Sequence, residues 1–134
     1  MKSVLIVEDD PETLAADCKA LAGHFLVLAA TDGDTALRMA RQARPAAIVL
    51  DVMLPDGKDG FSVYRDLRLD PATRDTPVVF LTSINRIMET TFGSQSIGRY
   101  LGSEPAAFLE KPIAPETLLH AVRTAIGDAT DGYP

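Results

Sequence analysis

The chain has a single cysteine and no long hydrophobic run, and each of these scarcities narrows the class of protein. A single thiol, Cys18, excludes an internal disulfide framework and suits a reducing compartment. The apolar run near the start, residues 4–7, ends at Glu8 and is too short for a signal peptide or a membrane span. We therefore expect a cytoplasmic protein without a membrane partner.

Basic residues are also in the minority. The chain carries 13 Lys and Arg against 19 Asp and Glu, which gives a formal net charge of −6. Nucleic acids and anionic membranes bind to basic patches, so this balance argues against direct nucleic-acid binding.

What the chain does have is a regular alternation of strand-length and helical patterns. Its 134 residues are enough for one domain that buries roughly two-thirds of its unfolded surface. Short apolar runs at 4–7, 25–30, 47–50, 78–81 and 106–109 are separated by stretches of helical periodicity. This alternation predicts a parallel sheet with helices on both faces. We expect one domain over residues 1–126, followed by a flexible tail or the start of a linker at 127–134.

The first helix is predicted from its start signal, and the others mainly from their helical periodicity. Asp10 can cap a helix that begins at Pro11, and further helices are expected over 34–42, over 60–69 and after Pro115. Ala114 stands where a capping side chain is common. Residues 83–103 have helical spacing that glycines interrupt, so they predict either one broken helix or a helix with a loop.

Polar residues stand at the carboxyl ends of four predicted strands, where open parallel sheets bind ligands. Asp51 alone could be a surface acid that follows a strand. Other polar residues, however, stand at the ends of the other predicted strands: Glu8, Asp9 and Asp10; Thr82 and Ser83; and Glu110, Lys111 and Pro112. Clustered carboxylates need a cation, and hard oxygen ligands suit Mg²⁺. An aspartate neutralised in this way can attack phosphorus, with Lys111 and Thr82 as donors to the phosphoryl oxygens. The set predicts phosphoryl transfer to an aspartate, with Asp10 as a helix cap.

Five motifs in this order, VEDDPE, IVLDVMLP, DGF, VVFLTS and FLEKPI, resemble the receiver domain of two-component response regulators, the CheY-like family. The resemblance covers about residues 3–126. It implies a flavodoxin-like (βα)5 three-layer fold with the parallel strand order 2-1-3-4-5. It also implies phosphoryl transfer from a sensor histidine kinase or a histidine phosphotransfer protein, with onward signalling in a phosphorelay.

The resemblance also assigns the metal site. Asp51 matches the phosphoacceptor, and Glu8 and Asp9 match the acidic pair that holds Mg²⁺, Asp9 directly and Glu8 through water. Met53 stands where the family supplies a backbone carbonyl to the metal.

The remaining roles follow from the same matches. Lys111 matches the lysine that contacts the phosphoryl group, and its bond to Pro112 is expected to be cis. Thr82 and Phe108 match the hydroxyl and aromatic pair that rearranges on phosphorylation, although an aromatic residue in an apolar strand is as often simply part of the core.

Two stretches depart from the family pattern. The loop MLPDGKDGF is one residue longer than usual, which can move Gly57 and Asp59. The segment between Thr82 and Lys111 is several residues longer, which leaves the downstream target and any homodimer surface undefined.

Three other functions can be compared with this one. A phosphatase or phosphotransferase of the aspartyl-phosphate type would carry a second Asp where Met53 stands. A flavodoxin-like cofactor binder would need a phosphate-cradling loop, and EDDPE is acidic. A degenerate receiver that binds proteins without phosphorylation is the alternative that the motifs leave open. We expect no enzymatic activity beyond self-phosphorylation and self-dephosphorylation.

Overall fold

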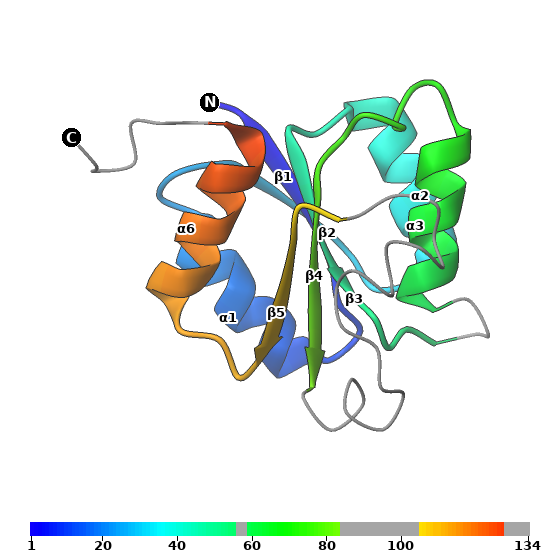
Figure 1. Ribbon diagram of the computed structural model, residues 1–134. Helices are drawn as coiled ribbons and strands as arrows, with labels where there is room; N and C mark the ends of the chain where they lie inside the picture. The colour runs from blue at the N-terminus through cyan, green and yellow to red at the C-terminus, as the bar shows by residue number, and fades with distance from the viewer. Residues whose placement is uncertain (56–58, 84–104, 128–134) are drawn as a thin grey trace.

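The computed structural model describes residues 1–55, 59–83 and 105–127, and its centre is a five-stranded parallel sheet. The strand order is β2-β1-β3-β4-β5, as predicted (Figure 1). The strands are β1 (Ser3–Val7), β2 (Leu26–Ala30), β3 (Ala47–Asp51), β4 (Val78–Ser83) and β5 (Ala107–Lys111). β3 lies at the centre and is buried along its whole length, which explains its unbroken apolar sequence.

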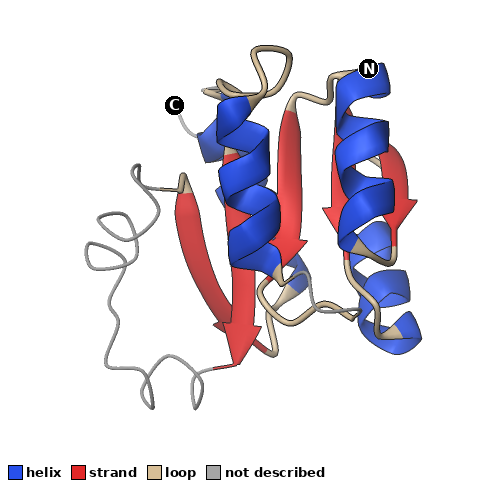
Figure 2. Ribbon diagram, turned by 90° about the vertical axis from the view of Figure 1, so that its right-hand side faces the viewer, coloured by secondary structure: helices blue, strands red, loops and turns tan. Residues whose placement is uncertain are grey.

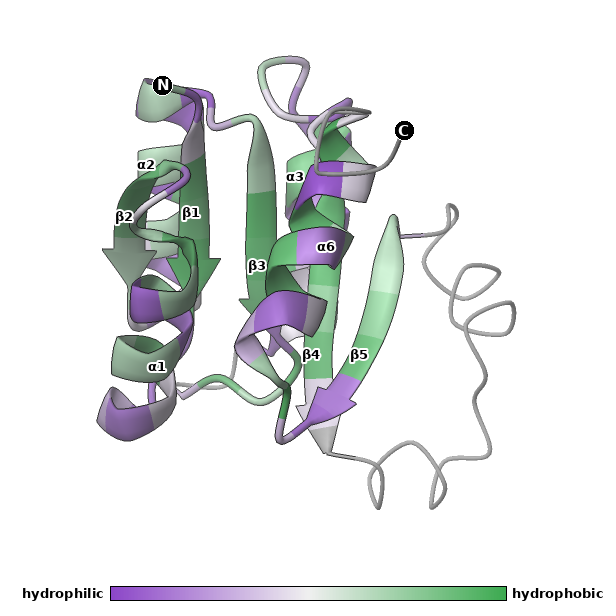
Figure 3. Cartoon of the chain, turned by 90° about the vertical axis from the view of Figure 1, so that its left-hand side faces the viewer, coloured by the Kyte–Doolittle hydropathy of each residue, from purple (hydrophilic) through white to green (hydrophobic). Residues whose placement is uncertain are grey.

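Helices cover both faces of the sheet. α1 (Pro11–Leu21) and α6 (Pro115–Ile126) pack on one face, and α2 (Gly33–Ala43) and α3 (Gly60–Leu69) pack on the other (Figure 1). Figure 2 views the second pair of helices in front of the strands, and Figure 3 views the first pair. Where the chain is described, the fold is therefore the predicted three-layer sandwich.

Side-chain caps fix the start of three of these helices. Asp10, Asp32 and Asp59 each accept a hydrogen bond from the backbone N–H three residues later. Such a cap satisfies one of the N–H groups that a helix start leaves free. α6 begins after Ala114 without a side-chain cap, as its sequence predicted.

The core consists of two clusters of apolar side chains, one on each face. Figure 3 shows the strands green, for hydrophobic, over most of their length, whereas β5 turns purple at its carboxyl end. The cluster under α2 and α3 includes Leu50, Tyr64 and Phe80, and the cluster under α1 and α6 includes Val49, Leu81 and Leu118. Residue parity along each strand thus decides which face a side chain meets.

Most predicted boundaries lie within two residues of those observed. β3 is one residue longer than its apolar run because Asp51 still pairs with Leu81. Gly127 ends α6 in the left-handed conformation, with φ 83°. The rest of the predicted tail and the unclear 83–103 segment, apart from Ser83, lie outside the described residues. No helix within those described ranges is long and apolar enough to cross a membrane.

Candidate active site at the carboxyl edge of the sheet

The strand register brings the predicted site residues to one edge of the sheet. Asp51 is the last residue of β3 and Lys111 the last of β5, while Glu8 directly follows β1. The backbone N–H of Glu8 still donates to the carbonyl of Ala30, which holds this residue against the sheet. Because the strands are parallel, all these residues meet at the same edge.

Three carboxylates converge there. Glu8, Asp9 and Asp51 each offer an oxygen, and these oxygens all lie within 4.8 Å of one another. Glu8 is 1% exposed and Asp51 3% exposed, whereas Asp9 faces solvent. Two buried hard ligands beside an exposed one suit Mg²⁺, which binds through a few carboxylates and keeps several waters. The donor set therefore fits this ion.

Lys111 ties two of these carboxylates together. Its Nζ donates to Glu8 Oε1 at 2.6 Å and to Asp51 Oδ2 at 2.9 Å. Burial disfavours the charge on Lys111, but these two hydrogen bonds outweigh it and raise the pKa of the ammonium group. The lysine is thus held as a cation directly beside Asp51.

The same surroundings also raise the pKa of Glu8, and for a carboxyl group the rise favours the neutral form. Burial, and then the hydrogen bond with the Asp51 carboxyl, raise the pKa of Glu8 to about 7, although Lys111 works against the rise. One ammonium group does not compensate two adjacent buried carboxylates. A further cation bound at this site would therefore compensate the remaining negative charge.

The turn after Asp51 holds this carboxyl group in place. The backbone N–H of Met53 donates to Asp51 Oδ1 at 3.1 Å, and the Met53 side chain is exposed. Gly60 then donates its N–H to the carbonyl of Val52 at 2.8 Å. The start of α3 is therefore fastened to the chain just past Asp51.

Gly60 is the site residue that the sequence analysis did not single out. A Cβ at this position would lie 2.3 Å from the backbone oxygen of Asp51 and 2.8 Å from Cα of Val52. Both atoms belong to the backbone, so they cannot swing away, and only glycine fits. The signal was present in the DGF motif, which was used for family resemblance but not read as a close approach of two backbones.

Thr82 and Phe108 lie on the other face of the sheet. Thr82 pairs with Glu110, and Phe80 pairs with Phe108, so these four side chains share the parity of the α3 face. Thr82 is buried, and the half-buried Phe108 ring stacks on Phe80 with 5.1 Å between centroids. Phe61 of α3 lies 6.5 Å from Phe108. In this structure Phe108 is part of an aromatic cluster.

Two smaller expectations are confirmed. Asp10 caps α1, with its carboxylate accepting hydrogen bonds from both the N–H and the hydroxyl of Thr13. The peptide bond between Lys111 and Pro112 is cis. Asp10 is accordingly occupied by its own helix and stands apart from the three converging carboxylates.

Comparison with known families agrees with this geometry. The family model for the response regulator receiver domain matches residues 4–123. The chain is 38% identical over 122 residues to the response regulator PleD of Caulobacter vibrioides, covering 90% of this chain and 25% of PleD. It is 29% identical to protein PilH of Pseudomonas aeruginosa, covering 94% of this chain and 98% of PilH.

Solved structures give the same result. The receiver domain of a sensor histidine kinase from Pseudomonas aeruginosa PAO1, with a magnesium ion coordinated in its active site cleft, superposes with a TM-score of 0.79 at 27% identity, covering 94% of this chain and 98% of that one. Chemotaxis protein CheY4 of Vibrio cholerae gives a TM-score of 0.78 at 28% identity, covering 93% and 98%.

The fold and the acidic edge together are those of a receiver-type signalling module. The chain belongs to the response regulator receiver domain family, within two-component signal transduction. It spans about a quarter of PleD and about half of the regulator RpaA of Synechocystis, but nearly all of PilH.

Proposed function

We propose that this chain accepts a phosphoryl group on Asp51 from the phosphohistidine of a sensor histidine kinase or a histidine phosphotransfer protein, and that the reaction depends on Mg²⁺. The observation that carries the proposal is the convergence of Glu8, Asp9 and Asp51 within 4.8 Å, with Lys111 Nζ 2.9 Å from Asp51. Receiver domains in general accept a phosphoryl group from such donors, so the proposal concerns this chain's own residues and metal.

The metal would be held by Asp9 and Asp51, by Glu8 through water and by the backbone carbonyl of Met53. When bound, Mg²⁺ would neutralise charge on the transferring phosphoryl group. The match of three acidic oxygens to a hard divalent ion supports this assignment.

The chemistry falls to Asp51. Its carboxylate oxygen forms a bond to phosphorus while the bond from phosphorus to the donor imidazole breaks, and the bonding electron pair stays on the imidazole nitrogen. The Met53 N–H and Lys111 fix the orientation of the carboxylate before the reaction. Lys111 is close enough to turn toward a phosphoryl oxygen once one arrives.

Phosphorylation of Asp51 would change the surface on the face of the sheet that α2 and α3 cover. Thr82 supplies a hydroxyl at the same edge, and Phe108 shares its face of the sheet. Movement of Thr82 toward a new phosphoryl dianion would remove a neighbour of the aromatic cluster and let the Phe108 ring turn, which is a two-state switch. We take residues 1–126 as the unit that makes this switch.

The test is intact mass after incubation with acetyl phosphate and Mg²⁺. We expect one phosphoryl group on the unaltered chain, none on Asp51→Asn and none when a chelator removes the metal. Asp75→Asn, which removes an exposed acid on the loop before β4, is the matched control and should gain the group normally. Equal phosphorylation of Asp51→Asn would refute the assignment. A chain that gains no phosphate and forms no beryllofluoride complex would instead be a phosphorylation-independent binding module.

A further inference from the structure

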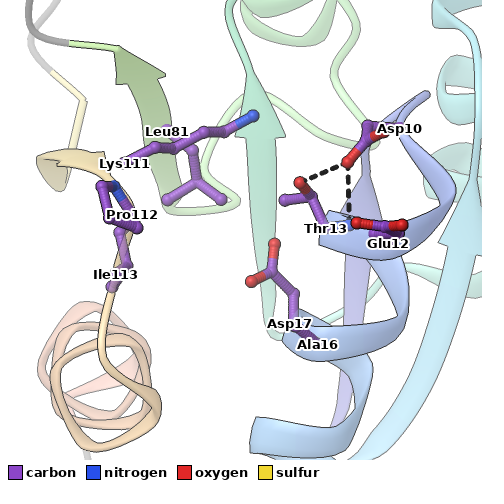
Figure 4. Close-up of a pocket in the computed structure, with 9 residues that line it drawn as sticks. All are labelled: Asp10, Glu12, Thr13, Ala16, Asp17, Leu81, Lys111, Pro112 and Ile113. Atoms are coloured by element: carbon purple, nitrogen blue, oxygen red, sulfur yellow. Dashed lines mark hydrogen bonds between the residues drawn. The ribbon is translucent and has the colours of Figure 1, made fainter.

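A second feature of the molecule lies beside the acidic edge. A cavity of about 390 Å³ opens between α1 and the segment that joins β5 to α6. Its size is within the range of small-ligand pockets, about 300–1,000 Å³. One wall is apolar and consists of Leu81, Pro112 and Ile113, with Lys111 beside it. Across from it lie the acids Glu12 and Asp17 of α1 and the capping Asp10 (Figure 4).

Asp17 is the unusual member of this set. The residue as a whole is only 7% exposed. Within the described part of the chain, Asp17 Oδ2 is the buried side-chain oxygen or nitrogen that lacks a hydrogen-bond partner. Figure 4 shows the carboxyl group pointing from α1 into the cavity. A buried carboxylate without a partner is costly, and a native protein usually supplies one.

The neighbouring groups do not supply this partner. Asp10 is engaged by Thr13, and Lys111 directs its Nζ to Glu8 and Asp51. Burial raises the pKa of Asp17 to about 6, with Lys111 opposing and Asp51 adding to the rise. The carboxyl group is therefore mostly ionised at neutral pH, and Lys111 compensates its charge only in part.

We propose that this cavity is a binding site for the guanidinium group of an arginine side chain presented by a protein partner, with Asp17 as its anchor. Charge complementarity carries the choice of ligand, because three acids, Asp10, Glu12 and Asp17, line the cavity against a single cation, Lys111. The chain as a whole also has a net charge of −6. A water molecule would donate a hydrogen bond to Oδ2 but would not compensate the negative charge of the carboxylate. A guanidinium group would do both.

The apolar wall favours a long basic side chain over a bare inorganic cation. The methylene stem of an arginine can lie along Leu81, Pro112 and Ile113 while its planar head reaches the carboxylate of Asp17. Arginine can meet a carboxylate with two parallel hydrogen bonds, which lysine cannot. The cavity shares Lys111 with the acidic edge, but its anchor is Asp17, so the proposal does not require phosphorylation of Asp51.

The test is a titration followed by amide NMR signals of the labelled protein, with Nα-acetyl-arginine methylamide as the probe. We expect saturable shifts at Ala16, Asp17, Cys18 and Ile113. The citrulline analogue has nearly the same shape without the charge. It should bind at least about tenfold more weakly, because a hydrogen bond to a charged group typically contributes a factor of about ten or more to affinity. The side-chain carboxyl carbon of Asp17 should shift in step with the amide signals.

Variants locate the binding. Asp17→Asn should weaken it about tenfold, and Asp75→Asn, which removes an equal charge on a distant loop, should leave it unchanged. The same spectra report whether each variant is folded, and the Asp17 carboxyl signal of the unaltered protein gives an answer without any variant.

Several results would overturn the proposal: no saturable shift, equal binding of the citrulline analogue, undiminished binding by Asp17→Asn, or an unmoved Asp17 carboxyl signal. Loss of binding in Asp9→Asn alone would place the cation at the three converging carboxylates instead. Phosphorylation of the same samples by acetyl phosphate is read separately, so failure of the cavity and failure of Asp51 are distinguishable.

Discussion

Asp17 makes the stability of this protein depend on pH in a direction opposite to that of an ordinary paired carboxylate. Its pKa rises from 3.8 to about 6 on folding, chiefly because the group is buried. Well below pH 3.8 the carboxyl is protonated in both states and has no effect. Between pH 4 and 6 the unfolded chain loses the proton while the folded chain keeps it, so the free energy of unfolding falls as pH rises.

The size of this loss follows from the shift. About two pKa units at 1.36 kcal/mol each give an upper limit of about 3 kcal/mol. The cavity admits solvent, and Lys111 offers a partly compensating charge, so we expect about 1–2 kcal/mol in practice. Replacement by asparagine keeps the shape and removes the charge. Asp17→Asn should therefore become progressively more stable than the unaltered chain across this window, and the difference should level off above pH 7.

Urea unfolding at half-unit steps from pH 3.5 to 8 measures the difference. Only its dependence on pH is diagnostic, because asparagine can have a constant effect of its own. Asp75→Asn provides the baseline for loss of an exposed acid. A flat profile for Asp17→Asn, or one in which the variant loses stability as pH rises, would refute the reasoning.

Two further predictions concern the acidic edge. Gly60→Ala should destabilise the protein by about 1–3 kcal/mol, because its Cβ would overlap the backbone of Asp51 and Val52; an unchanged urea midpoint would contradict this. Mg²⁺ should raise the thermal midpoint of the unaltered chain by mass action, worth about 2.7 kcal/mol at one hundred times the dissociation constant. Asp9→Asn should lose most of that gain, whereas Asp75→Asn should retain it.

Much of the fold was predictable because local signals and global pattern agree. The apolar runs predicted the five strands, and Asp10 before Pro11 predicted the start of the first helix. The caps at Asp32 and Asp59 became evident only in the structure. The strand order was predicted from the family resemblance. Periodicity identifies each strand but does not show which strands are hydrogen-bonded to one another. The end of β3 was misplaced by one residue because an acid looks like a terminus until its pairing with Leu81 is known.

The site was predictable to the extent that its residues stand at strand ends. Parallel strands bring their carboxyl ends together, so Glu8, Asp51 and Lys111 had to meet once the order was known. Asp17 was missed, although its spacing carried a signal. It lies three residues after Leu14 and four before Leu21, which places an acid on the inward face of α1. Whether such an acid finds a partner depends on packing from distant segments, here the one after β5.

The site residues are distributed over both faces of the sheet. Asp51 and Lys111 have the parity of the α1 and α6 face, whereas Thr82 and Phe108 have the parity of the α3 face. A charge that changes on Asp51 must therefore act across the sheet to reach the aromatic cluster. Among the described residues two links can carry it. One is Thr82 at the end of β4. The other is the contact of Gly60 with the backbone of Asp51 and Val52, which fixes the start of α3 one residue before Phe61. Because the second link joins backbone to backbone with no room for a Cβ, a displacement of Asp51 cannot be absorbed by a side chain there and has to move α3 or the peptide after Asp51.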